Sequence, residues 1–104
     1  KSLIKYDNNF SKEELAKCLT NQNIKLYIKE GRGSSEILLN YFENSSKYLT
    51  IVNCGENWDI IRVRCGTELG EIEGLPFWIK PNGEKLIGGE QSDSLFRIRD
   101  FSDC

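Results

Sequence analysis

The sequence has no histidine, no long apolar run and no excess of charge of either sign, and each absence excludes a class of function. Without histidine the chain lacks the usual general base and a favoured zinc ligand, so Cys-His and Ser-His-Asp catalysis are excluded within it. No apolar run approaches the roughly 18 to 20 residues that span a bilayer, so no transmembrane helix is predicted. The net charge of −2, with both signs interspersed, disfavours binding to nucleic acid.

Length and composition predict one domain that covers residues 1–104. The chain has 104 residues, close to the commonest domain size, and 38% of them are hydrophobic, which suffices for a single packed core. It begins at Lys1 rather than Met, and no hydrophobic segment of a signal peptide follows. We therefore expect a mature or excised fragment, with membrane association only through a domain absent from this chain.

The residues that most constrain function are four cysteines, Cys18, Cys54, Cys65 and Cys104. Four cysteines allow three pairings, and an even number suits an oxidising compartment. No two of them have the close C-x₂₋₄-C spacing of a zinc site, so neither a metal nor a cofactor is predicted. The carboxylates are scattered along the chain, which gives no support to a small-molecule enzyme of unrelated type.

A first helix is predicted after Ser11, because Ser11 and Glu14 form a capping-box pattern. Its buried stripe is formed by the apolar residues at helical spacing, Leu15, Cys18 and Leu19. Cys18 is accordingly interpreted as a core thiol. Its pairing with Cys104 stays open, and a free thiol at Cys104 would permit a disulfide-linked dimer in place of a monomer.

A strand, a helix and a second strand are predicted next. "IKLYI" (24–28) is rich in strand-forming residues and runs into the polar loop 30–35, where Ser34 or Ser35 is positioned to cap a helix. The apolar face of that helix is expected to comprise Ile37, Leu38, Tyr41 and Phe42. "YLTIVNC" (48–54) is then predicted as a strand that is buried on both faces. This βαβ order implies a parallel pair of strands.

The remainder predicts a crossover helix, a hairpin and a closing helix. The pattern from Asn57 to Leu69 is ambiguous between helix and strand, and a helix is favoured because a crossover is needed. "LPFWIK" (75–80) and "KLIGG" (85–89) flank a Pro-Asn-Gly-Glu turn and predict a hairpin. The tail "SDSLFRIRDF" predicts a helix capped at Ser92 or Asp93, with the apolar residues Leu95, Phe96, Ile98 and Phe101.

This element order is that of the thioredoxin fold, and six features of the sequence add a closer resemblance: "ELAKCLT" (14–20), "KLYI" (25–28), "IVNC" (51–54), Cys65, "IEGLPFW" (72–78) and "GGEQSDSL" (88–95). In this order and spacing they resemble the thioredoxin-like domain attached to bacterial and plant homologues of vitamin K epoxide reductase. The resemblance implies an α/β, thioredoxin-like fold, with a central mixed β-sheet flanked by helices and an extra N-terminal helix. It also implies an exported oxidising compartment, the bacterial periplasm or the thylakoid lumen.

The redox motif of that family is missing. In the family, the strand equivalent to "KLYI" is followed by Cys-Pro-His-Cys at a helix N-terminus, where a thiolate is stabilised and attacks disulfides. The motif falls here on Arg32, Gly33, Ser34 and Ser35. A serine hydroxyl cannot form a disulfide, so dithiol exchange at this loop is excluded.

Two interpretations of the loop are kept. In the first, Gly31 and Gly33 permit a tight turn and Ser34 or Ser35 caps the helix. In the second, the vacant helix N-terminus beside Arg32 binds an anion or a peptide backbone.

The resemblance implies two further features. One is a cis Leu75–Pro76 bond, beside which the family binds an extended peptide. The other is a Cys54–Cys65 disulfide. We expect that disulfide to be structural, because its spacing differs from that of an exchange site. The leading hypothesis is thus a redox-inactive module that binds a protein or peptide or has a structural role. The alternative is a thiol-disulfide oxidoreductase that works through Cys54 and Cys65.

Overall fold

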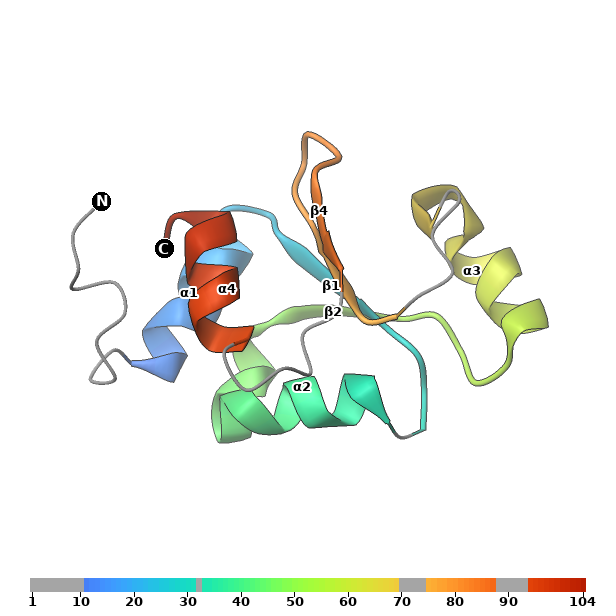
Figure 1. The fold of residues 1–104 in the computed structure, drawn as a ribbon, viewed down its shortest axis with the longest axis horizontal. Coiled ribbons are helices and arrows are strands. Elements are labelled where there is room, and N and C mark those ends of the chain that lie inside the picture. Colours follow the sequence, from blue (N-terminus) through green and yellow to red (C-terminus); the bar gives the residue numbers. More distant parts are fainter. Residues whose placement is uncertain (1–10, 32, 70–74, 88–93) are drawn as a thin grey trace.

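A computed structural model of the chain describes residues 11–31, 33–69, 75–87 and 94–104 (Figure 1). The described elements, in chain order, are α1 (Lys12–Asn21), β1 (Lys25–Ile28), α2 (Ser34–Phe42), the 3₁₀ helix η2 (Glu43–Tyr48), β2 (Thr50–Asn53), α3 (Trp58–Leu69), β3 (Phe77–Ile79), β4 (Lys85–Ile87) and α4 (Ser94–Ser102). The helix predicted after Ser11, the crossover helix predicted over 57–69, and the described parts of the predicted hairpin and closing helix are thereby confirmed.

The four described strands form one mixed sheet in the order β2-β1-β3-β4. Strands β1 and β2 are parallel, with Leu26 opposite Ile51, as a βαβ unit requires. Strand β3 lies antiparallel to β1 on the other side, with Trp78 opposite Leu26, and β4 completes the hairpin. The chain is therefore an α/β protein, in agreement with the predicted class.

Helices cover both faces of this sheet. Neighbouring residues of a strand point to opposite sides, so β1 and β3 contribute side chains to two core clusters. Leu26 and Trp78 belong to one core cluster, which includes residues of α1, α2 and α4. Tyr27 and Phe77 belong to the other cluster, with Ile61 and Cys65 of α3. The two aromatic rings stack with centroids 5.0 Å apart. In Figure 1, α3 lies at the opposite end of the molecule from α1 and α4.

The N-terminal helix begins as the sequence predicts. The Oγ atom of Ser11 accepts a hydrogen bond from the backbone N–H of Glu14 at 3.2 Å, which satisfies one unpaired donor of the first turn. Leu15 and Leu19 are buried, but Cys18 is only half-buried and forms a disulfide with Cys104. The interpretation of Cys18 as a core thiol is therefore wrong.

Two predictions about α2 are also wrong. Gly33 is the N-cap residue, and neither Ser34 nor Ser35 caps the helix, because both lie inside its first turn. Ile37 is 43% exposed, whereas Leu38 and Phe42 are buried. The buried apolar face of α2 is therefore narrower than the predicted face of Ile37, Leu38, Tyr41 and Phe42.

Strand β2 lies at an edge of the sheet and is not buried on both faces as predicted. Its residues alternate between half-buried and exposed, and Ile51 is 37% exposed. Apolar residues on both faces of a strand indicate a central position only when other strands flank it on both sides. Among the strands that the structure describes, β1 takes that position, and β2 has a strand neighbour on one side alone.

Candidate functional site

The candidate site lies where the parallel strands β1 and β2 end, the place where α/β proteins commonly bind ligands. Backbone hydrogen bonds continue past both strands. The N–H of Cys54 donates to the carbonyl of Ile28 at 2.9 Å, and the N–H of Glu30 donates to the carbonyl of Gly55 at 2.8 Å. The start of the loop after β1 is therefore fixed to the segment that leads to α3.

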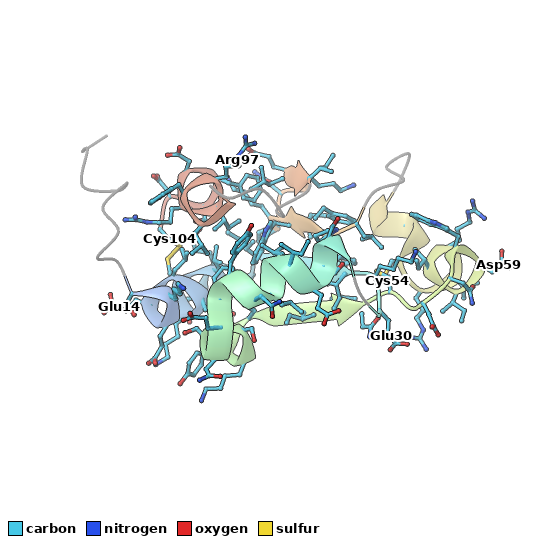
Figure 2. The ribbon with its side chains drawn as sticks, turned by 60° about the horizontal axis from the view of Figure 1, so that its bottom comes forward. Glu14, Glu30, Cys54, Asp59, Arg97 and Cys104 are labelled. Carbon is cyan, nitrogen blue, oxygen red and sulfur yellow. A yellow bond between two sulfur atoms is a disulfide. The ribbon has the colours of Figure 1, made fainter. Side chains whose placement is uncertain are left out.

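The side chain of Asn53 joins these two segments. Its Nδ2 donates to a carboxylate oxygen of Glu30 at 3.0 Å, and its Oδ1 accepts from the N–H of Gly55 at 2.9 Å. Figure 2 shows Glu30 and Cys54 at the same end of the molecule, towards α3. Asn53 is not among the residues predicted from the sequence, although a polar residue at the carboxyl end of a strand in a βαβ unit is a usable signal.

The loop itself is shaped by glycine. Gly31 and Gly33 have φ angles of 110° and 96°, which L-residues with a side chain rarely adopt. Both glycines therefore have the backbone freedom that the first interpretation assigned to them. Arg32 lies outside the residues that the structure describes, so the anion site proposed beside it has no structural description.

Ser35, on which the resemblance places the second cysteine of the redox motif, has a structural role. It is 4% exposed, and its Oγ accepts a hydrogen bond from the backbone N–H of Lys29 at 3.1 Å. This bond ties the first turn of α2 back to the end of β1. Ser34 is half-buried. The hydroxyl of Ser35 therefore closes the loop through one hydrogen bond.

The Cys54–Cys65 disulfide implied by the resemblance is present. Its Cα atoms lie 5.6 Å apart, and it joins the residue after β2 to the middle of α3. Cys54 and Cys65 are 0% and 1% exposed, in the same buried cluster as Tyr27 and Phe77. An attacking thiolate must reach a sulfur atom, so this bond is closed to exchange while the domain is folded.

The Leu75–Pro76 bond is cis. Tyr27 lies opposite Phe77 in the antiparallel pair, and one further step along this register brings Pro76 beside Ile28, the last residue of β1. Pro76 is buried, and the half-buried Leu75 packs against the cluster that contains the Cys54–Cys65 disulfide. The structure thus brings Leu75 and Pro76 to the same end of the sheet as the loop.

The electrostatics of this site are modest. The Nζ atom of Lys29 lies 5.9 Å from the centroid of the Trp58 ring, which links the loop to the start of α3. On α1, away from this site, the hydrogen bond from Lys17 to Glu13 and the attraction between their charges lower the pKa of Glu13 and raise that of Lys17. The described residues contain no group of three His, Cys, Asp or Glu side chains placed to hold a metal ion.

All four cysteines are in disulfides, so no thiol remains for nucleophilic chemistry. Two disulfides in one small domain indicate an oxidising compartment. Among the helices that the structure describes, none has the length and apolar character to cross a membrane.

Comparison with known proteins identifies no family for this chain. A scan against models of protein families finds no match for this chain, and a search of curated proteins finds no match either.

Proposed function

We propose that this chain is a redox-inactive thioredoxin-like domain, related to the domain attached to bacterial and plant homologues of vitamin K epoxide reductase. The support lies in the order of elements. A helix, a βαβ unit, a crossover helix on the opposite face, an antiparallel hairpin entered through an X-Pro bond and a closing helix follow one another. This is the order that the resemblance implies.

The proposed lack of redox activity is supported chiefly by the bonding and burial of the sulfur atoms. A thioredoxin-like enzyme needs an accessible thiolate at the loop after β1, and a second thiol one turn later. Here Ser35 stands at that second position and uses its hydroxyl in a buried hydrogen bond. The disulfide nearest to the loop, Cys54–Cys65, is buried. The alternative, an oxidoreductase that works through Cys54 and Cys65, would require this part of the domain to open.

The proposed role is a binding or structural module in an exported oxidising compartment, either the bacterial periplasm or the thylakoid lumen. The proposed partner is an extended segment of a protein or peptide beside Leu75 and Pro76. Three features favour this position: its place at the carboxyl end of β1, the exposed loop glycines Gly31 and Gly33, and the rigid connection through Asn53. A rigid, preformed site loses less conformational entropy on binding.

A peptide titration followed by NMR tests this role. A library of extended peptides is added to the ¹⁵N-labelled chain, and the expected result is shifted amide signals at Leu75, Phe77 and the loop 30–35. Leu75→Glu weakens binding, because it places a carboxylate in the site. Ile87→Glu is the matched control, since Ile87 is an exposed apolar residue of β4. Equal weakening by both variants, or shifts confined to another surface, would contradict the proposed site.

A further inference from the structure

The two disulfides differ in their access to solvent. Cys54 and Cys65 are 0% and 1% exposed, whereas Cys18 is half-buried and Cys104 is exposed. Figure 2 shows the sulfur bridge of Cys104 at the edge of the molecule, beside α1. Since thiol-disulfide exchange depends on access to a sulfur atom, the two bonds should differ strongly in reactivity.

The backbone around Cys104 holds the bond at the surface. The N–H of Asp103 donates to the carbonyl of Arg99 at 2.8 Å, and the φ angle of Asp103 is 64°, which turns the chain at the end of α4. The N–H of Cys104 donates to the Oγ of Ser102 at 3.2 Å. Cys104 is therefore presented in a defined position next to the last turns of α1.

An amide donor lies within hydrogen-bonding distance of both sulfur atoms. The Nε2 atom of Gln22, directly after α1, lies 3.5 Å from the Sγ of Cys18 and 3.3 Å from the Sγ of Cys104. A hydrogen bond to sulfur stabilises the thiolate more than the neutral thiol, because the thiolate carries the full negative charge. Gln22 can therefore stabilise a thiolate as it leaves this disulfide.

We propose that the Cys18–Cys104 disulfide is an exchange site, at which the thiolate of a small thiol or of a protein cysteine forms a mixed disulfide with Cys104. The incoming thiolate attacks the Sγ of Cys104, a new S–S bond forms, and the bond between Cys104 and Cys18 breaks. The electron pair of the broken bond leaves on the Sγ of Cys18 as a thiolate. The step consumes no external oxidant or reductant beyond the named thiol, and it reverses when Cys18 attacks the mixed disulfide.

The direction of attack follows from the surroundings of the two sulfur atoms. Cys104 is exposed, whereas Cys18 lies on α1 between the buried residues Leu15 and Leu19. A large attacking group therefore reaches Cys104 more readily, and Cys18 becomes the leaving group.

Exchange leaves the fold in place. Helix α4 stays anchored through the buried Ile98, which belongs to the same core cluster as Leu19 and Trp78. Cys104 lies beyond that anchor, so a covalent adduct there does not enter the core. This exchange is stoichiometric capture of a thiol rather than turnover, and it does not depend on the thioredoxin-like assignment.

The experiment uses the folded, oxidised chain and reduced glutathione as the probe. Samples are quenched with acid at intervals, alkylated with N-ethylmaleimide and analysed by intact mass and peptide mapping. The expected early product carries glutathione on Cys104 and the alkyl group on Cys18, with Cys54–Cys65 intact. Opening of the buried bond should be at least about tenfold slower, because it requires local unfolding.

Three outcomes would overturn the proposal: equal or faster opening of Cys54–Cys65, glutathione placed on Cys18, or no reaction of either bond in the folded chain. Gln22→Ala provides a sharper test, because removal of the amide donor should slow adduct formation by about threefold. The matched control is Asn21→Ala, which removes an exposed amide from the same end of α1. An equal rate for wild type and Gln22→Ala would remove Gln22 from the proposal, and circular dichroism verifies that each variant is folded.

Discussion

Removal of the Cys54–Cys65 disulfide should destabilise the domain by about 3 kcal/mol through loop closure alone. The bond spans a sequence separation of 11, and a cross-link over a loop of that size removes about 9 to 10 cal/mol/K of entropy from the unfolded chain. For 104 residues, a loss of 3 kcal/mol corresponds to a fall in Tm of about 14 °C.

Helix α3 makes this perturbation informative, because among the described residues its contribution to the core is limited to Trp58, Ile61 and Cys65. Its buried residues Ile61 and Cys65 face the sheet, while Val63 is 86% exposed and Ile60 is 39% exposed. The disulfide therefore supplies a large share of what holds α3 to the sheet. In the Cys54→Ala/Cys65→Ala variant, we expect amide exchange to accelerate more in α3 than in α1.

The assay is urea denaturation followed by circular dichroism, with the oxidised wild type as reference. The matched variant is Cys18→Ala/Cys104→Ala, whose bond spans a separation of 86, so the same entropy argument predicts a larger loss of about 4.6 kcal/mol. A loss below about 1 kcal/mol for Cys54→Ala/Cys65→Ala would refute the assignment of this bond as a structural cross-link.

Three further predictions concern single residues. Gly55→Ala should lower the free energy of unfolding by about 2 to 3 kcal/mol, because the residue has a φ angle of 115° and an added Cβ would lie 2.5 Å from the Cγ2 of Ile60. Gly83→Ala is the control: its φ angle is 93° but the space around it is open, so the loss in the same denaturation assay should be about 1 kcal/mol. Ser35→Ala should cost about 1 to 2 kcal/mol, because it leaves the N–H of Lys29 without its acceptor, whereas Ser34→Ala should have a smaller effect; equal losses would contradict the role of Ser35. Lys17→Met should raise the pKa of Glu13 in an NMR titration, because the 2.8 Å hydrogen bond from Lys17 lowers it. The stabilisation from this lowered pKa is present above the unfolded value and is lost as the pH falls through the folded value, and an unchanged titration curve would show that the pair does not form in solution.

Much of the fold could be predicted from local signals. Ser11 and Glu14 predicted the start of α1, and the Pro-Asn-Gly-Glu turn predicted the hairpin of β3 and β4. The crossover helix α3 was predicted from topology rather than from its own pattern, which is ambiguous because Ile60 and Val63 lie on its exposed side. The predicted cap of α4 at Ser92 or Asp93 lies outside the described residues.

The errors arise where tertiary contacts override local preference. Serine is a favoured N-cap, but the positive φ angle of Gly33 starts α2 one residue earlier and leaves Ser35 free to bond with Lys29. The apolar residues of β2 resemble those of a central strand, yet the strand order places β2 at an edge. Cys18 has the spacing of a core residue, and only the approach of Cys104 from a distant part of the chain shows that it is bonded.

The candidate site was predicted in part. The loop glycines and the residues Leu75 and Pro76 were assigned from the sequence and its resemblance, and the structure brings them to one end of the sheet. Asn53 bridges Glu30 and Gly55 through two hydrogen bonds. This bridge depends on the parallel pairing of β1 and β2, which brings together segments that are far apart in the sequence. No local pattern encodes that contact.

Reduction of insulin by the chain in the presence of dithiothreitol tests directly whether the domain is redox-inactive. We expect a rate equal to that of dithiothreitol alone, because the loop after β1 has no thiol, Cys54–Cys65 is buried, and exchange at Cys18–Cys104 is stoichiometric rather than catalytic. Cys54→Ser and Cys104→Ser variants show whether any turnover depends on either disulfide. Turnover above the background that is lost in Cys54→Ser would contradict the redox-inactive assignment and support an oxidoreductase that works through Cys54 and Cys65.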